Sequence, residues 1–337
     1  MEIGKLDNET LQRLVLGRTG AARQEVIAGP GIGEDCSVLD FGAYECVLST
    51  DPITSTASHI GTLAVHVACN DVASNGVEPF AVMLTFLFPP SVTEEEIGEI
   101  ARQADEAAKE LGVQIAGGHT EITDAVTQPI ASATAIGRVQ KKKKQTRGGA
   151  SFTKEDTPKP GDMIVVTKSL ALEGTAIAAE QHADKLSAFL TSDEIEYAKA
   201  MLDRISVVRE GVIAGNIGIH AMHDITEGGI LGAVWELCTH YGVGAEVQAA
   251  SLPFDPVTLS LCAILGLDPM RLISSGSMLI FASEKQWGLL RAALSEADVA
   301  ASVIGRIQAA ERGLALVMKN GESEEIAPPG PDEIYRI

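Results

Sequence analysis

Acidic side chains recur where a predicted strand passes into a glycine-containing loop. Five segments share this arrangement: GIGEDCSVL (31–39), LSTDP (48–52), CNDVASNG (69–76), AGGHTE (116–121) and MHDITEGG (222–229). Their polar residues of interest are Asp35, Asp51, Asn70, Asp71, His119, Glu121, Asp224 and Glu227. Hard divalent cations such as Mg²⁺ take oxygen ligands and are usually shared between a few carboxylates and the phosphates of a substrate. We therefore expect these loops to converge on a Mg-nucleotide.

Asp71 differs from the other acids because of its flanking sequence. An Asp in a turn often hydrogen-bonds its own backbone, so each of the other acids also has a purely structural interpretation. Helical periodicity through Ile60, Leu63 and Val67 places Asp71 near an apolar face, where an unpaired carboxylate is costly to bury. We expect Asp71 to have a partner or a metal.

The double glycine Gly228-Gly229 precedes a predicted helix that begins at Ile230. It is suited to present backbone N–H groups to an anion, although double glycine is also common in plain turns. The sequence contains no GxxxxGK[ST], GxGxxG, HExxH or GxSxG motif. His220 and His223 are three residues apart on a predicted strand and would point to opposite sides, so we predict two satisfied histidines rather than joint metal ligands.

The composition excludes several classes of protein. The 337 residues include 26 Lys+Arg and 46 Asp+Glu, and the net charge of −20 argues against a general nucleic-acid binder. With 45% hydrophobic residues, the chain can bury a core and is expected to form about two domains. Five scattered cysteines favour neither a disulfide framework nor a zinc site. A polar N-terminus and short apolar runs predict a cytoplasmic protein without a membrane segment.

A basic segment separates two halves of the chain. Residues 138–160 hold eight Lys or Arg and only two acids, together with a double glycine and two prolines. We interpret residues 139–160 as a solvated linker, and the alternative is that Lys141–Lys144 form an anion-binding patch. The expected divisions are a segment 1–28, a domain 29–138, the linker 139–160 and a second domain 161–337.

Hydrophobic patterns predict alternating strands and helices in both halves. In the first half we expect strands at 46–50, 80–88 and 113–116, and helices at 59–73 and 93–111, the second opened by a capping box. The order predicts a βαβ-containing α/β or α+β domain. The second half is predicted to be another mixed α/β domain, with strands at 163–167, 221–223, 278–282, 301–307 and 314–318 and helices at 173–182, 193–202, 207–216, 230–240, 256–265 and 286–297.

Taken in order, the segments GIGEDCSVL, STDP, NDVASNG, GGHTE, HDITEGG and SSGS (274–277) resemble the motifs of the ATP-dependent superfamily of aminoimidazole ribonucleotide synthetase (PurM). That superfamily also includes the hydrogenase-maturation protein HypE, thiamine-monophosphate kinase and selenophosphate synthetase. The resemblance extends from about Gly29 to Arg336 and is strongest to the HypE-like branch.

The resemblance implies a two-domain PurM-like fold in which N-terminal strands pair with those of a second subunit in a dimeric β-barrel. ATP would lie between the domains, and Mg²⁺ would join its phosphates to Asp35, Asp51, Asp71 and Asp224. The implied catalytic residues are Asp71, His119 and Glu121. The implied ATP or phosphate contacts are Gly31, Gly33, Asn70, Gly117, Gly118, Thr120, Thr226, Gly228 and Gly229.

Three departures narrow the activity that the resemblance implies. HypE ends in a cysteine that carries the carbamoyl group, whereas this sequence ends PPGPDEIYRI (328–337), so HypE's reaction on its own tail is not expected. Selenophosphate synthetase needs a reactive Cys or selenocysteine in its N-terminal segment, whereas the first cysteine here is Cys36, which is better interpreted as a small buried residue. His119 stands where several relatives carry an acid, so either one Mg ligand is missing or Glu121 replaces it.

Three functions stay open from the sequence. The first is an ATP- and Mg-dependent enzyme that activates an amide- or carboxyl-type oxygen of a small molecule and releases phosphate. The second is a direct small-molecule kinase resembling thiamine-monophosphate kinase, which leaves the phosphate on its product. The third is a nucleotide-binding scaffold with a protein partner in a maturation pathway. Phosphoryl transfer needs mainly positioning and charge neutralisation, which clustered carboxylates holding Mg²⁺ provide.

Overall fold

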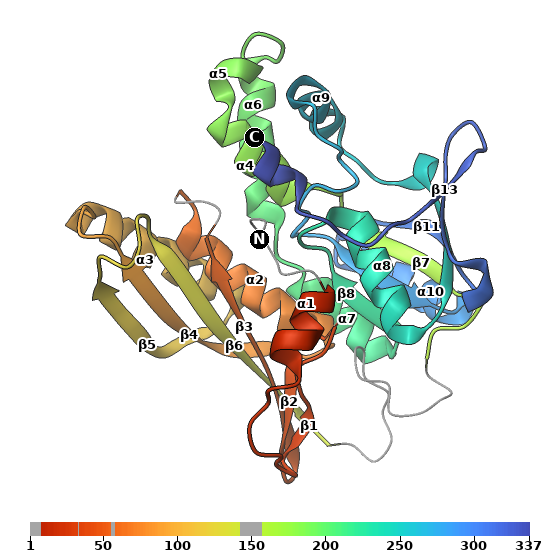
Figure 1. Ribbon diagram of the computed structural model, residues 1–337, viewed down its shortest axis with the longest axis horizontal. Coiled ribbons are helices and arrows are strands. Elements are labelled where there is room, and N and C mark those ends of the chain that lie inside the picture. Colours follow the sequence, from red (N-terminus) through yellow and green to blue (C-terminus); the bar gives the residue numbers. More distant parts are fainter. Residues whose placement is uncertain (1–7, 33, 55–57, 142–156) are drawn as a thin grey trace.

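The computed structural model describes residues 8–32, 34–54, 58–141 and 157–337. Two α+β domains lie side by side in Figure 1, the first coloured red to yellow and the second green to blue. The first domain begins with two short helices, α1 (Asn8–Leu11) and η1 (Gln12–Leu16). None of the described helices is both long and apolar enough to cross a membrane.

The N-terminal domain is built on a six-stranded sheet in the order β1-β2-β3-β6-β4-β5. Its strands are β1 (Val26–Ala28), β2 (Ser37–Phe41), β3 (Tyr44–Ile53), β4 (Pro79–Phe88), β5 (Gln114–Ile122) and β6 (Ile130–Gln140). Strands β4 and β5 pair in parallel and are joined by a helix, which confirms the predicted βαβ unit. The other pairings in this sheet are antiparallel.

Helices α2 (Ile60–Ser74) and α3 (Glu94–Leu111) cover one face of this sheet (Figure 1). The alternating residues Ala131, Ala133 and Ala135 of β6 are fully buried beneath them, because side chains on a strand point to opposite faces in turn. Helix α3 begins with the predicted capping box at Thr93 and ends at Gly112 in the left-handed conformation. The opposite face of the sheet carries the half-buried or exposed side chains of Leu48 and Met83.

The C-terminal domain contains a seven-stranded sheet in the order β13-β12-β9-β11-β7-β10-β8. Its strands are β7 (Met163–Thr167), β8 (Ala221–Asp224), β9 (Gly244–Gln248), β10 (Met278–Ala282), β11 (Ala301–Gln308), β12 (Leu314–Val317) and β13 (Ser323–Glu325). Helix α8 (Gly229–Tyr241) packs on one face, and α7 (Val208–Ile217) and α10 (Glu284–Glu296) pack on the other. Because both faces are covered, β7 and β10 are buried along their whole length.

A third hydrophobic cluster lies in the upper part of the C-terminal domain in Figure 1. It is formed by α4 (Leu172–Gln181), α5 (Ala183–Leu186), α6 (Ser192–Lys199) and α9 (Pro256–Leu265), and residues of the C-terminal turn η5 (Glu333–Arg336) and its flank pack into it. The remaining short turns are η2 (Ala200–Arg204), η3 (Ala249–Ser251) and η4 (Ala310–Arg312).

The two domains meet where α2 crosses α7. Asn70 on α2 is fully buried, and its side-chain amide donates to the Ile205 carbonyl at 2.8 Å while its oxygen accepts from the Val207 N–H at 2.8 Å. Gly76 and Gly215 are in such close contact that a Cβ on Gly215 would lie 2.4 Å from the Gly76 Cα. The hydrophobic core of the first domain also includes Leu172 and Met201 of the second, so the domains share one core.

The sequence prediction contained no strand for β1, β2, β6, β9 or β13, and two strand boundaries differ from it. Strand β3 continues through Asp51 to Ile53, because residues 51–53 stay paired with β6, so Asp51 lies within a strand and not after its end. Strand β5 continues through the AGGHTE segment to Ile122, paired with β4 throughout, so this segment is not a loop. Glycine at 118 permits the close pairing, since a Cβ there would lie 1.7 Å from the Leu84 carbonyl oxygen.

The predicted linker begins inside a strand, because β6 runs to Gln140. Lys141, the first residue of the lysine run, forms an ion pair with Asp40. Lys142 to Lys144 and the rest of the central linker, residues 142–156, lie outside the described residues.

Candidate functional site

A cavity of about 340 Å³ lies between the two domains and collects most of the predicted acids. We call it the acidic cavity. Seven carboxylic acids line it: Glu34, Asp35, Asp51, Asp71, Glu173, Asp224 and Glu227. The first four belong to the N-terminal domain and the other three to the C-terminal domain.

Three elements of the N-terminal domain position Asp35, Asp51 and Asp71. Asp35 precedes β2, Asp51 lies on β3, and Asp71 lies on the last turn of α2. Asp71 is 5% exposed and accepts a short hydrogen bond from the Ser49 hydroxyl of β3. Its side chain also hydrogen-bonds Asp51, so the strand and the helix hold two carboxyl groups together. The predicted burial of Asp71 with a partner is confirmed.

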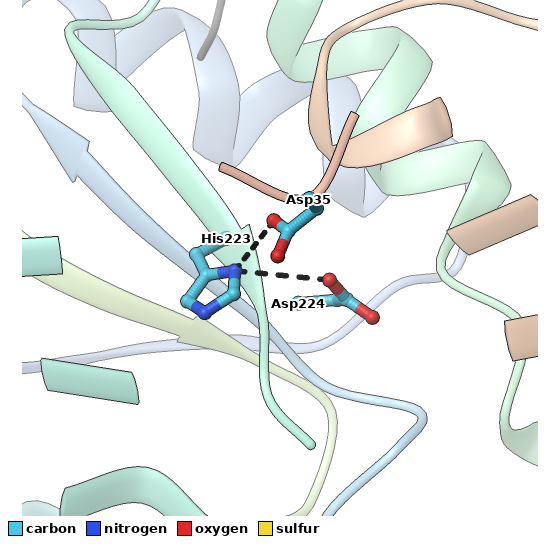
Figure 2. Close-up of side chains that lie close together, drawn as sticks. All are labelled: Asp35, His223 and Asp224. Carbon is cyan, nitrogen blue, oxygen red and sulfur yellow. Dashed lines mark hydrogen bonds and ion pairs between the residues drawn. The ribbon is translucent and has the colours of Figure 1, made fainter. Parts of the chain in front are cut away.

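Asp224 of the C-terminal domain comes close to Asp35 through His223 (Figure 2). The His223 Nδ1 is 2.8 Å from Asp35 Oδ2 and 3.8 Å from Asp224 Oδ1, and its Nε2 is 3.3 Å from Glu236 Oε2. Burial lowers the pKa of His223, but Asp35 and Glu236 outweigh burial and hold this pKa well above its ordinary value. His223 is therefore a cation that joins the two domains at the edge of the acidic cavity.

The acids repel one another, and this repulsion indicates what the cavity can bind. Burial raises the pKa of Asp71 well above its ordinary value, and the charges of Asp224, Asp51 and Asp35 raise it further. Carboxylate oxygens of Asp35 and Asp224 lie within 4.8 Å of each other, beside His223. A cluster of oxygen donors under mutual repulsion suits a hard divalent cation, which would relieve the repulsion.

Asn70 does not take part in this cavity. The resemblance places it beside phosphate, but both polar atoms of its side chain are used at the domain junction, and the residue is fully buried. Its backbone neighbour Asp71 points toward the cavity because adjacent helix positions face different directions. The structure assigns Asn70 to joining the domains, which corrects the expected phosphate contact.

The structure does not bring the GGHTE segment to the acidic cavity of the same chain. His119 and Glu121 are exposed on β5 at the sheet edge, and the His119 Nε2 lies 2.9 Å from Glu121 Oε2. Gly117, Gly118 and Thr120 lie on the same exposed strand. Strands β6 and β4 separate β5 from β3, which carries Asp51. A single chain therefore does not place His119 and Glu121 beside Asp71.

The predicted anion-binding glycines are already hydrogen-bonded within the chain. The Gly228 N–H donates to Asp332 Oδ2 at 2.7 Å, and the Gly229 N–H donates to the Thr226 carbonyl at 3.2 Å. Neither glycine lines the acidic cavity, whereas Thr226 does. Gly31 forms a turn that accepts from the Glu34 N–H at 3.3 Å, and Gly33 lies outside the described residues. Gly228 and Gly229 thus lie next to the cavity-lining residues Thr226 and Glu227 without presenting free N–H groups to the cavity.

Sequence reasoning missed Glu173 and Tyr335, which line the C-terminal side of the acidic cavity together with Ser275 of the SSGS segment. Glu173 is 3% exposed in the first turn of α4. The sequence did contain a signal for Glu173, because it is the single acid within the apolar stretch SLALEGTAIAA (169–179). His223 was predicted to be a satisfied histidine, and it is one, but its partners include an acid of the site.

Two family profiles match the chain in the order of its domains. The N-terminal domain of AIR synthase related proteins matches residues 33–139, and the C-terminal domain of AIR synthase related proteins matches residues 159–317.

Three curated relatives span most of this chain. A putative hydrogenase expression/formation protein of Methanocaldococcus jannaschii is 29% identical over 74% of this chain and 72% of its own length. The carbamoyl dehydratase HypE of Rhizobium leguminosarum is 25% identical over 73% of this chain and 68% of its own length. The thiamine-monophosphate kinase of Methanospirillum hungatei is 30% identical over 66% of this chain and 71% of its own length.

Solved structures confirm the two-domain PurM-like fold. The hydrogenase maturation protein HypE in complex with ATP aligns with a TM-score of 0.71 at 21% identity, covering 98% of this chain and 97% of that one. A chain of the HypE–HypF complex aligns with a TM-score of 0.72 at 22% identity, covering 88% of this chain and 94% of that one.

Proposed function

The chain belongs to the AIR synthase-related, PurM-like family, and we propose that it is an ATP- and Mg-dependent enzyme that activates an amide- or carboxyl-type oxygen of a small molecule by phosphorylation. The relatives include ATP-using enzymes: a HypE structure contains ATP, and thiamine-monophosphate kinase transfers phosphate.

The observation that carries this proposal is the convergence of Asp35, Asp51, Asp71 and Asp224 on one cavity. The four residues come from four separate segments of two domains: the loop before β2, and β3, α2 and β8. Seven acids around one cavity cost folding energy through mutual repulsion, and a bound cation would offset that cost. Such an arrangement suits a bound cation, such as the Mg²⁺ ion of a Mg-nucleotide.

In this proposal the four aspartates hold Mg²⁺, which supplies neutralisation of the phosphate charge when bound. The Ser49 hydroxyl of β3 hydrogen-bonds the Asp71 carboxyl group and fixes its position. His223 of the C-terminal domain hydrogen-bonds Asp35 and so holds it against that domain. Thr226 and Glu227 form the wall from which a substrate would approach. The chain's own contribution is thus positioning across the domain junction.

A direct kinase is the second candidate function. It is supported by the 30% identity to a thiamine-monophosphate kinase, which is as high as that to the hydrogenase-related proteins. The two candidates differ in the fate of the γ-phosphate, which stays on the product of a kinase. A scaffold role with a protein partner is the third, and the HypE–HypF complex shows that a protein of this fold takes such a partner.

The proposal includes a homodimer. Figure 1 shows helices on one face of the N-terminal sheet, and the opposite face carries Leu48, Met83 and Ile136 at half-buried or exposed positions. A second copy that covered this face would also meet β5, whose nine residues are exposed. His119 and Glu121 would then contribute to the enzyme through the dimer, because they are remote from the cavity of their own chain.

The test is a calorimetric titration of the protein with ATP in the presence and absence of Mg²⁺. We expect Mg-dependent binding that Asp71→Asn weakens by about tenfold or more, since a hydrogen bond or ligand contact with a charged group is worth roughly 1.5–3 kcal/mol. Asp105→Asn on the exposed face of α3 is the matched control and should bind as the wild type does. Equal affinity in the two variants would remove Asp71 from the site. Phosphate release with candidate amides then separates the first candidate function from the kinase.

A further inference from the structure

We propose that Asp35, His223 and Asp224 form a site for a divalent first-row transition ion such as Mn²⁺, with the His223 Nδ1 as one of its ligands. This ion would take the place of a Mg²⁺ ion at the corner of the acidic cavity where the three residues meet (Figure 2). The inference rests on the proposed function in one respect, the assignment of Asp35 and Asp224 as cation ligands, and it names the cation that they select.

The three side chains lie close enough together to be ligands of one ion. One ligand atom from each residue falls within 4.8 Å of the other two. The His223 Nδ1 is 2.8 Å from Asp35 Oδ2 and 3.8 Å from Asp224 Oδ1, and Figure 2 shows this nitrogen turned toward both carboxyl groups. Ligand bonds of about 2.0–2.2 Å place opposite ligands of one ion roughly 4 Å apart. Small side-chain movements are therefore enough to bring the three atoms around an ion.

The His223 ring is oriented through its other nitrogen. The Nε2 lies 3.3 Å from Oε2 of Glu236 on α8, and Glu236 is not one of the three ligands. A metal-bound histidine almost always donates its second ring N–H to a carboxylate or carbonyl, which fixes the ring and its tautomer. Glu236 has this position here. The nitrogen left for a metal is Nδ1, which is the one that faces Asp35 and Asp224.

The charge at this corner favours an ion with two positive charges. The side chains of His223 and Asp224 are only 6% and 1% exposed, so water screens them little. Asp35, Asp224 and Glu236 all act on the His223 ring, and the charges of Asp35 and Asp224 also act on Asp71. A divalent ion would replace the proton on Nδ1, which leaves to the solvent. The positive charge among the carboxylates then rises from one to two.

The ligand set decides which divalent ions this corner selects. Mg²⁺ prefers oxygen ligands and keeps several waters, whereas imidazole nitrogen suits first-row transition ions. A sulfur ligand is not available from the neighbouring Cys36, because its thiol donates to the Asp71 carbonyl at 3.2 Å and burial raises its pKa well above the ordinary value. Two carboxylates with one imidazole therefore indicate a transition ion that accepts both oxygen and nitrogen, as Mn²⁺ does.

The first experiment detects the ligand nitrogen and needs no variant. The full-length protein is loaded with one equivalent of Mn²⁺ without nucleotide, and pulsed electron paramagnetic resonance records the coupling of the bound ion to ¹⁴N. We expect the coupling of a coordinated imidazole, and we expect it to disappear when the protein is produced with ¹⁵N-labelled histidine. Mn²⁺ that binds without nitrogen coupling, or that does not bind, would overturn the proposal.

His223→Asn then tests the residue. Asparagine can keep a hydrogen bond to Asp35 but has no imidazole nitrogen, so we expect Mn²⁺ affinity to fall by about tenfold or more and Mg²⁺ affinity by less than about threefold. His220→Asn is the matched control, because the His220 Nδ1 is 2.6 Å from Asp162 in another histidine–carboxylate pair, and it should leave both affinities unchanged. An equal loss of both ions in His223→Asn would mean that His223 only holds Asp35 in place.

The results are distinguishable from those that test the proposed function, because the Mn²⁺ experiments contain no nucleotide. If calorimetry shows that Mg-ATP binds while the bound Mn²⁺ has no nitrogen ligand, the transition-metal site is wrong and the proposed function stands. If Mn²⁺ binds through His223 and ATP does not bind, the metal site stands and the nucleotide-dependent function is wrong.

Discussion

At the scale of single residues, Glu173 shows that an acid on the wall of a cavity can weaken the fold that carries it. Burial raises the pKa of Glu173 to about 7 from an ordinary 4.5, and Ser275 offsets this only in part. A carboxyl group with a raised pKa binds its proton more tightly in the folded protein than in the unfolded chain. Its unfavourable contribution is therefore absent below pH 4.5 and fully present above pH 7.

The direction of this pKa shift predicts how Glu173→Gln changes the free energy of unfolding. At pH 8 the variant should be more stable than the wild type by about 3 kcal/mol, because a tenfold change in the acidity of one group between the folded and unfolded states corresponds to roughly 1.4 kcal/mol. Near pH 4.5 the two proteins should differ little. Urea unfolding at both pH values measures the difference, and Glu180→Gln at a surface position of α4 should show no such dependence on pH. A stability gain that is the same at both values would mean that the Glu173 charge is not the cause.

The residues of the site also show what the sequence could and could not predict. The convergence of Asp35, Asp51, Asp71 and Asp224 on one cavity was predicted from acids that stand where predicted strands pass into glycine-containing loops. For Asp71 there was the further signal that an acid beside an apolar face is costly without a partner. Asn70 was expected beside phosphate from the resemblance, and the sequence does not show that its amide bonds the backbone of the other domain. Glu173 belongs to no motif, and only the folded chain brings it to the cavity.

At the scale of elements, the contact between α2 and α7 joins the two domains. Both polar atoms of the Asn70 side chain are bonded to the backbone of the segment that leads into α7. Glycines allow the chain segments to approach closely at the same crossing. Gly211 of α7, for example, lies directly against the backbone of Ala73 on α2. The two walls of the acidic cavity are consequently held in one relative position.

We predict that Asn70→Ala will lower stability by about 3 kcal/mol, because it leaves a buried carbonyl and a buried N–H without partners. Thermal unfolding should show a clear fall in the midpoint, whereas Asn216→Ala at an exposed position of α7 should change it little. Nucleotide affinity measured well below the unfolding temperature should fall less than in Asp71→Asn. A larger fall in nucleotide affinity in Asn70→Ala than in Asp71→Asn would instead place Asn70 in the nucleotide site.

The longer helices and eight of the thirteen strands in the described residues were predicted, whereas β1, β2, β6, β9 and β13 were missed. Two of the predicted strands were too short, and these two errors have a common cause. The helices followed from periodicity and capping, and α3 begins and ends at the predicted residues. Strands β3 and β5 were predicted too short because glycine and polar residues usually interrupt a strand. Here pairing with neighbouring strands overrides that tendency, since Asp51 opposes Ala133 and Gly118 opposes Leu84.

At the scale of the whole molecule, the uncovered face of the N-terminal sheet predicts a dimer that a charge should disrupt. Met83 on this face is 47% exposed. We expect wild-type protein to be dimeric in light scattering and Met83→Lys to be monomeric, because a dimer would bury the added charge without a partner. Phe189→Lys, at an exposed position between α5 and α6, should stay dimeric. A wild-type monomer at micromolar concentration would rule out the shared barrel.

The core that both domains share also affects how the chain is synthesised. Ile60 and Leu63 of α2 belong to the same hydrophobic cluster as Leu172 and Met201, more than a hundred residues later. A nascent chain that has just completed β6 therefore leaves the ribosome with part of its first core uncovered. At roughly 5–20 residues per second, the residues still to be added take several seconds to arrive. During that interval we expect the first domain to expose apolar surface that chaperones can bind, and to complete its core only when the second domain has begun to fold.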